Sequence, residues 1–236
     1  MNNPMKNAHL ESLLLEMTGA SSVLHLEEIQ SLWSGYGSIS RYALEGCAIK
    51  QMVVKYVQWS NQPSHPRGWN TSISHQRKIK SYHVESAWYK QYSQLAQSEM
   101  KMPQCLGVRD IEAGCLILLE DLDAAGFPVR KSSANFKEMS QCIKWLAHFH
   151  GKFLETPPEG LWATGTYWHL ETRPDELKAM KDQALSAAAQ AIDEKLSGCP
   201  YQTLVHGDAK LANFCFSKTT DQFQLLIFNM WVVVLV

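Results

Sequence analysis

The chain has 236 residues, of which 45% are hydrophobic and 19% are charged, and its formal net charge is −1. This length suits one large domain or two lobes, and the composition is that of a globular protein able to bury a core. A charge so close to zero gives no electrostatic basis for binding nucleic acid or an anionic membrane, so neither partner is expected.

The cysteines and the N-terminus favour a cytoplasmic protein. The six cysteines are scattered without a Cys-x-x-Cys pair, and several lie in apolar runs, which indicates reduced, buried thiols. Residues 1–4 lack the apolar core of a signal peptide, and no stretch approaches the ~18 apolar residues of a membrane-spanning helix. We therefore expect cytoplasmic localisation.

The first forty residues predict a helix and a glycine turn between two strands. Apolar residues at helical spacing end at Gly19, and they are Leu10, Leu13, Leu14 and Met17. Further on, Gly35 and Gly37 flank a single residue between strand-like segments, and Ser38 follows them. A loop with so little side chain lets backbone N–H groups approach phosphate oxygens, although a Gly-x-Gly turn is more often a plain hairpin.

A strand, a loop and a long helix come next. Residues 48–57 are apolar and β-branched, as in a strand, and they contain Lys50 and Lys55. The segment 60–75 is rich in Pro, Gly, Ser and Asn and predicts a loop. A helix is expected over 77–97. Its apolar face would consist of Val84, Trp88, Tyr92 and Leu95.

A buried strand closes the first half of the chain. Residues 114–122 are almost wholly apolar and end in Glu120, Asp121 and Leu122. The stretch 124–128 contains alanine, glycine and proline and predicts a break in regular structure. We interpret this break as the boundary between two lobes.

The two lobes are expected over 1–122, which includes the hinge, and over 123–236. Two helices are predicted in the second lobe, one over 135–154 and one from about Thr172 to residue 197. The apolar stripe of the first helix would be Phe136, Met139, Ile143, Leu146, His150 and Phe153. The second would pack through Leu177, Met180, Ala184, Ala188 and Ile192.

The stretch 204–216 carries the strongest chemical signal. Apolar residues lead into it and out of it, as in two buried strands, and between them lie His206, Gly207, Asp208 and, five residues later, Asn213. A carboxylate there can orient an acceptor hydroxyl and take its proton, and an amide oxygen can hold Mg²⁺. The spacing is that of the kinase loop His-Arg-Asp-x-x-x-x-Asn, with Gly207 in place of Arg, although Gly, Asp and Asn are also ordinary turn residues.

With this loop and the parts upstream of it in the same order, the chain resembles the small-molecule kinases of the protein-kinase-like fold. These are the aminoglycoside phosphotransferases, the choline and ethanolamine kinases and the ecdysteroid-kinase-like proteins, and the ecdysteroid-kinase-like (choline-kinase-like) branch is the most similar. The resemblance implies an α+β, two-lobed fold with an antiparallel small-lobe sheet and a helical large lobe. It also implies ATP and Mg²⁺ as cofactors and a small-molecule hydroxyl acceptor.

The resemblance implies a nucleotide site in the first lobe. Lys55, in Val53-Val54-Lys55, is similar to the strand lysine that holds the α- and β-phosphates, and it is preferred over Lys50. Glu85 matches the helix glutamate that pairs with this lysine, and Glu99 is the alternative. The nucleotide-binding residues would be Gly35, Gly37, Ser38, Lys55, Glu85, Glu120 and Leu122, the last two through their backbone.

In the second lobe, the resemblance implies that Asp208 is catalytic, that Lys210 contacts the transferred phosphoryl group and that Asn213 binds the metal. Lys55 and Glu85 would then lie on one wall of a cleft between the lobes, with Asp208 and Asn213 on the other.

One part of this pattern is missing. Family members have an aspartate, often in Asp-Phe-Gln, that holds Mg²⁺ after a hairpin following the catalytic loop. A hairpin is predicted, with its turn over 217–222 and its return strand over 223–226, but residues 227–236 contain no aspartate and Asp221 comes too early. The chain is therefore expected to be a kinase by lineage with little or no activity. The alternative is a non-catalytic remnant that at most binds nucleotide.

The tail suggests a shifted reading frame. Met230 and Trp231 are each encoded by a single codon, and the residues around them allow a choice of codons. With a suitable choice, the alternate frame that starts at the last base of the Leu226 codon encodes Asp-Phe-Gln-Tyr-Val-Gly-Gly-Gly. This frame puts the metal-binding motif where the family has it. We therefore expect a C-terminally truncated, frameshifted chain whose large lobe is incomplete and leaves apolar helix faces uncovered.

Overall fold

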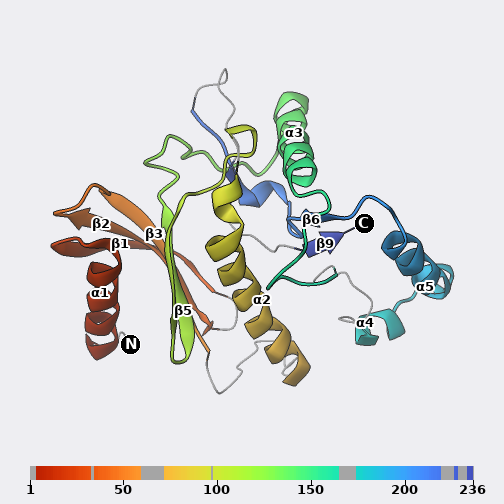
Figure 1. Cartoon of the computed structure of the whole chain (residues 1–236), viewed down its shortest axis with the longest axis horizontal. Helices are drawn as coiled ribbons and strands as arrows, with labels where there is room; N and C mark the ends of the chain where they lie inside the picture. The colour runs from red at the N-terminus through yellow and green to blue at the C-terminus, as the bar shows by residue number, and fades with distance from the viewer. Residues whose placement is uncertain are drawn as a thin grey trace. The chain divides into compact units, whose positions relative to one another are not determined.

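The structure is a computed structural model that describes residues 4–32, 35–59, 72–96, 98–164, 174–218, 226–227 and 233–235. The chain divides into two compact units. The first consists of Met1–Leu95 and Met102–Val129, and the second of Ala96–Lys101 and Arg130–Val236. Figure 1 labels the elements of both units.

The first unit contains a five-stranded sheet in the order β1-β2-β3-β5-β4, and all neighbouring strands are antiparallel. Its strands are β1 (Ser22–Ser31), β2 (Gly37–Glu45), β3 (Gln51–Gln58), β4 (Cys105–Ile111) and β5 (Gly114–Glu120). Strands that are adjacent in sequence pair as hairpins, which antiparallel geometry permits with short turns. The predicted α+β class and antiparallel sheet are confirmed.

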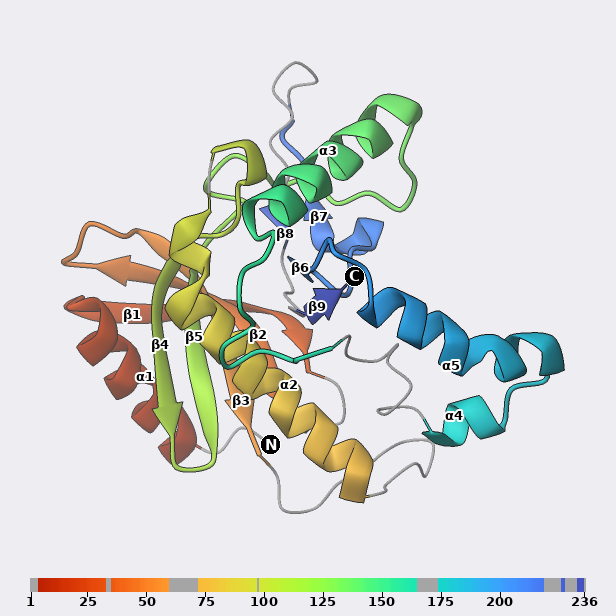
Figure 2. The ribbon, with the colours of Figure 1, turned by 45° about the vertical axis from the view of Figure 1, so that its right-hand side comes forward.

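Helices cover both faces of this sheet. The helix α1 (Pro4–Thr18) packs on one face, where Leu14 clusters with Met52 and Val54. The helix α2 (Ser72–Gln91) lies on the opposite face, as Figure 1 and Figure 2 show. Burial on both sides explains why β5 and the middle of β3 are mostly apolar. It also means that alternate residues of β3 face different helices.

The helix α2 begins and ends earlier than the predicted range of 77–97. It starts at Ser72, so polar residues that suggested a loop belong to its first turns. It ends at Gln91, and the short 3₁₀ helix η2 (Ser93–Leu95) follows, which leaves Leu95 exposed. Residues 60–71 of the predicted loop lie outside the described residues. The rest of the predicted apolar face is buried, at Val84, Trp88 and Tyr92.

The second unit is mainly helical. Its longer helices are α3 (Phe136–Lys152), α4 (Pro174–Lys178) and α5 (Gln183–Ser197), and its 3₁₀ helices are η3 (Ser98–Met100) and η5 (Leu211–Asn213). Two antiparallel pairs join β6 (Thr203–Val205) to β9 (Val233–Leu235), and β7 (Phe214–Cys215) to β8 (Leu226–Ile227). The second pair confirms the predicted hairpin, although residues 219–225 of its turn and return strand lie outside the described residues.

The helix α3 buries a different face from the one predicted. Phe136, Met139 and Ile143 of the predicted stripe are exposed by 86%, 51% and 60%. The helix has a second, aromatic stripe, in which Trp145 stacks on Phe149, and this stripe is buried because its large rings remove more apolar surface from water. The buried residues of the helix are Glu138, Cys142, Trp145 and Phe149, and Phe153 of the predicted stripe is also buried, at the C-cap.

The single helix expected from Thr172 to residue 197 is instead two helices. The carboxylate of Asp182 accepts the N–H of Leu185 at 3.0 Å and caps α5, so a new helix starts after α4 has ended. Neither helix has a buried residue, and the expected packing is not found. The exposed apolar residues of α5 are Leu185, Ile192 and Leu196.

Among the described residues, no helix combines the length and the apolar character needed to cross a membrane.

Candidate active site

Lys55 and Glu85 form a buried ion pair in the first unit. Lys55 lies in β3 opposite Ile39 and Ile117, on the face that α2 covers, and Glu85 comes from α2. The Lys55 Nζ atom donates to Glu85 Oε1 at 2.8 Å and to Oε2 at 2.6 Å. The two side chains are only 8% and 6% exposed. The pair predicted from the sequence is therefore present.

The competing lysine has a different environment. Lys50 precedes β3, is exposed, and donates through Nζ to the Cys47 carbonyl at 3.2 Å. Glu99, the alternative to Glu85, is exposed in η3 of the second unit. Of these two lysines, Lys55 is the one on the face of the sheet that α2 covers.

The surroundings of the pair are poorly solvated. Burial raises the pKa of the neighbouring Cys115 thiol to about 11. Burial, with a smaller contribution from Glu85, raises the pKa of Tyr89 well above its usual value. Charges attract more strongly in such an environment than in water. The carboxylate therefore holds the ammonium group in one place.

The glycine turn between β1 and β2 has the backbone that its sequence suggests. Gly35 and Gly37 have φ angles of +74° and +129°, which other residues rarely adopt. A Cβ atom on Gly37 would lie 1.9 Å from the Tyr56 carbonyl oxygen, whereas one on Gly35 would meet nothing within 4 Å. Ser38 pairs with Ser31 and Tyr56 and is half-buried. The turn is thus a hairpin whose second glycine is required by the close approach of β3.

The two glycines should respond differently to substitution. We expect Gly37→Ala to lower the free energy of unfolding by about 4 kcal/mol or more, because it adds a backbone clash to strain. Gly35→Ala adds strain alone, about 1–2 kcal/mol. Urea denaturation of both variants measures the difference. Equal losses would show that the clash at Gly37 is relieved by movement of β3.

The segment after β5 is held by hydrogen bonds of its backbone. The N–H of Glu120 donates to the Gln104 carbonyl at 2.9 Å, and the Gln104 N–H donates to the Glu120 carboxylate at 3.2 Å. The carbonyl of Leu122 accepts the N–H of Phe127 at 2.8 Å. None of these hydrogen bonds between described residues uses the Glu120 carbonyl or the Leu122 N–H.

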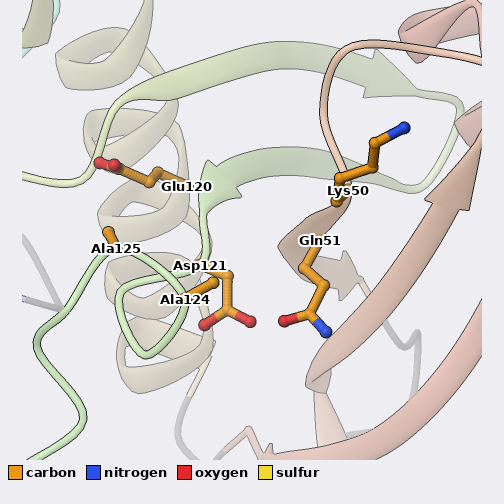
Figure 3. Close-up of a pocket in the computed structure, with 6 residues that line it drawn as sticks. All are labelled: Lys50, Gln51, Glu120, Asp121, Ala124 and Ala125. Atoms are coloured by element: carbon orange, nitrogen blue, oxygen red, sulfur yellow. The ribbon is translucent and has the colours of Figure 1, made fainter.

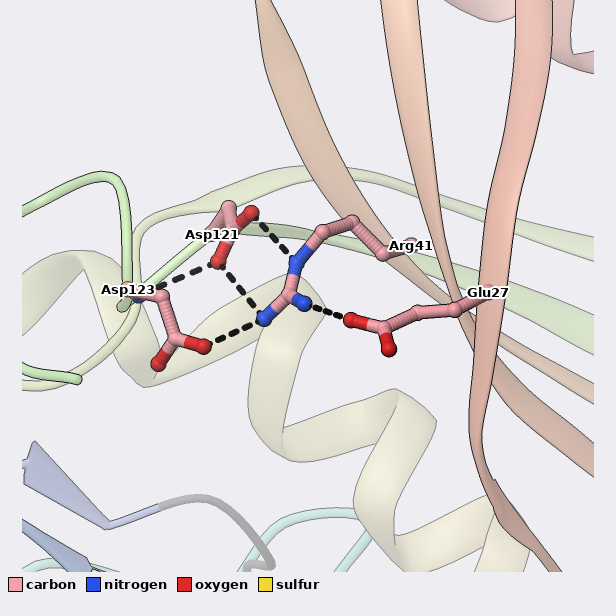
Figure 4. A network of polar contacts seen from close by, with 4 residues as sticks. All are labelled: Glu27, Arg41, Asp121 and Asp123. Atoms are coloured by element: carbon pink, nitrogen blue, oxygen red, sulfur yellow. Dashed lines mark hydrogen bonds and ion pairs between the residues drawn. The ribbon is translucent and has the colours of Figure 1, made fainter. Parts of the chain in front are cut away.

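Sequence analysis missed Arg41, which fixes this segment to the sheet. Arg41, on β2, donates through Nε to Asp121 Oδ2 at 2.7 Å and through Nη2 to Asp123 Oδ2 at 2.6 Å, and it also pairs with Glu27 on β1 (Figure 4). The Asp121 side chain is only 1% exposed. The available signal was a single arginine in an apolar strand, which needs a carboxylate partner.

A cavity of about 350 Å³ lies beside this network (Figure 3). We assign no ligand to it. Its lining residues are Lys50, Gln51, Glu120, Asp121, Ala124 and Ala125.

The loop after β6 in the second unit brings Asp208 and Asn213 together. Asn213 is buried and donates through Nδ2 to the Asp208 carbonyl at 2.7 Å and to its Oδ2 atom at 3.0 Å. Lys210 Nζ lies 2.9 Å from the same Oδ2 atom. Gly207, at a φ of +74°, makes the turn, and the Asp208 N–H donates to His206 Nδ1 at 3.1 Å. The carboxylate is thus held in place, yet its side chain is 33% exposed and accessible to a substrate.

The loop fits Mg²⁺ in the type of its ligands but not in their number. Because the Asn213 Nδ2 atom is directed at Asp208, the Oδ1 atom is the one left to face a cation, and Mg²⁺ prefers such oxygen ligands. In the part of the chain that the structure describes, no group of three or more His, Cys, Asp or Glu side chains could hold a metal.

No protein-family model and no curated protein matches the sequence. The solved structures that are similar in fold include the following two. One is a putative fructosamine-3-kinase from Haemophilus somnus 129PT, with a TM-score of 0.47 and 14% identity over 96% of this chain and 72% of that one. The other is a microcompartment-associated aminopropanol kinase, with a TM-score of 0.49 and 13% identity over 93% and 68% of the two chains. Both scores lie below 0.5, so the chemistry of this chain rests on its own residues.

Proposed function

We propose that the chain is, by lineage, an ATP-dependent phosphotransferase acting on a small-molecule hydroxyl acceptor. The observation that carries this proposal is the Lys55–Glu85 pair, because a lysine held by a carboxylate, on a strand paired with the one that follows a glycine turn, suits the binding of phosphates. The held Asp208 carboxylate supports it independently. The two sets of residues belong to different units, and the proposal requires them to act on one nucleotide.

On the nucleotide side, each group has a defined task. The Lys55 ammonium would neutralise charge on the α- and β-phosphates, and Glu85 would keep it in position. Backbone N–H groups of the glycine turn, from Gly35 to Ser38, would approach the phosphate oxygens. The Glu120 carbonyl and Leu122 N–H would bind the adenine edge.

On the acceptor side, Asp208 would orient the hydroxyl group and take its proton as the hydroxyl oxygen attacks the γ-phosphorus atom. The new O–P bond forms while the bond to the bridging oxygen breaks, and ADP leaves. Lys210 would stabilise the charge on the transferred group. Asn213 would hold Mg²⁺, which when bound supplies charge stabilisation at the phosphates.

We also propose that catalysis is impaired in this chain. Residues 227–236 contain no carboxylate side chain that could bind the metal together with Asn213. The described residues contain no cluster that could replace it. The competing proposal, a non-catalytic nucleotide-binding remnant, is favoured by the same observation. Nucleotide binding is common to both proposals, and turnover separates them.

ATP binding tests the shared part of these proposals. We expect calorimetry to detect ATP binding that strengthens with Mg²⁺ and weakens about tenfold or more in the double variant Lys55→Met/Glu85→Leu. That variant removes both charges, so neither is left buried alone. Lys50→Met is the matched control and should bind as the parent does. If the parent chain does not bind ATP, the proposed function is wrong.

A further inference from the structure

Tyr36, between the two glycines, ties the glycine turn to α2. It is only 2% exposed, and its hydroxyl group hydrogen-bonds to Nδ1 of His75 on α2. Its ring centroid lies 5.9 Å from that of Tyr82, also on α2. The turn is thus packed against the N-terminal half of this helix, next to the surface that carries Glu85.

Two lysines flank this pair of tyrosine rings. The Lys78 Nζ atom lies 5.2 Å from the centroid of the Tyr36 ring, and the Lys55 Nζ atom lies 5.5 Å from that of Tyr82. Residues 78, 82 and 85 are spaced by four and three along α2, so their side chains share one face. Lys78 and Glu85 are separated by two helical turns, about 10 Å along the axis.

Lys78 has the character of a binding lysine rather than a surface one. It is half-buried, and burial lowers its pKa to about 8. An ammonium group that is already partly desolvated loses less hydration when it meets an anion, and it attracts that anion more strongly than a fully hydrated group does. The ring of Tyr36 stabilises the charge by a cation–π contact.

We propose that Lys78 is a second phosphate-binding cation, placed beneath the glycine turn by Tyr36 and contacting the distal phosphates of the nucleotide. Two helical turns separate it from the Lys55–Glu85 pair, so the two lysines would contact different phosphates of one chain. This proposal rests on the proposed function, and it adds a residue that sequence analysis did not single out. Tyr36 is the residue that positions Lys78.

The test combines binding measurements with amine labelling. We expect Lys78→Met to weaken ATP binding about tenfold while AMP binding stays as in the parent, because AMP has no distal phosphates. Lys78→Arg should retain most of the affinity, and Lys80→Met, an exposed neighbour on α2, should retain all of it. In the parent chain, ATP and inorganic tripolyphosphate should each protect Lys78 from an amine-modifying reagent at pH 8, as read by peptide mass spectrometry.

Each outcome decides between the two proposals. Equal losses of ATP and AMP affinity in Lys78→Met, or labelling of Lys78 that neither anion reduces, would overturn the role of Lys78. If ATP binding depends on the Lys55–Glu85 pair but not on Lys78, the role of Lys78 is wrong and the proposed function still stands. Protection of Lys78 by tripolyphosphate, with ATP binding no tighter than tripolyphosphate, would keep the anion site and overturn the nucleotide function.

Discussion

Replacing Lys55 by methionine is expected to lower the free energy of unfolding by about 3–5 kcal/mol. The Glu85 carboxylate is 6% exposed and receives two hydrogen bonds from Lys55, so removing the lysine would leave a buried charge without its partner. Urea denaturation at neutral pH measures the loss.

The double variant is the decisive control. Lys55→Met/Glu85→Leu replaces both charges with apolar side chains of similar size, and we expect it to be within about 1–2 kcal/mol of the parent chain. Lys50→Met removes an exposed lysine and should change little. If Lys55→Met were as stable as the parent, water or another cation would have to reach the Glu85 carboxylate. The buried Lys55–Glu85 pair would then be absent from the protein in solution.

Phosphotransfer by this chain is expected to be at least about a thousandfold slower than the ~1–100 s⁻¹ of ordinary kinases. The physical reason is the missing metal-binding carboxylate, since a bound metal ion contributes several kcal/mol of charge stabilisation in the transition state. Release of ADP from ATP and Mg²⁺, with a panel of small hydroxyl compounds as acceptors, measures the rate.

Two variants interpret that assay. Asp208→Asn should abolish any residual turnover while leaving ATP affinity unchanged, because its proposed role is on the acceptor rather than the nucleotide. Ile227→Asp places a carboxylate at the position where the kinases that the sequence resembles have an aspartate, and it should tighten Mg²⁺-dependent ATP binding. Turnover in the ordinary kinase range by the parent chain would contradict the impairment and exclude the remnant.

The sequence by itself determined the features that depend on short separations along the chain. The spacing of Leu10, Leu14 and their neighbours fixes a helix ending before Gly19. The apolar runs of β3 and β5 fix buried strands, and the five-residue step from Asp208 to Asn213 fits one turn of loop. In each case a local pattern of side chains suffices to predict the element, although the residues that bury α1, β3 and β5 are distant in sequence.

The Lys55–Glu85 pair was predicted partly from local patterns and partly from the resemblance. Strand alternation and helix periodicity restrict which lysine and which glutamate can be buried, but the resemblance to a kinase supplied the pairing of residues 30 apart. The contacts show that the resemblance selected the right partners.

Only the tertiary structure decided which surfaces meet. The period of α3 permits two apolar stripes, and the aromatic one is buried because Trp145 and Phe149 meet Phe214, a residue distant in sequence. Arg41 finds Asp121 across 80 residues. Lys78 meets Tyr36 because the glycine turn folds onto α2. Periodicity tells which residues share a face, but burial and charge pairing depend on what packs against that face, and this is a property of the assembled fold.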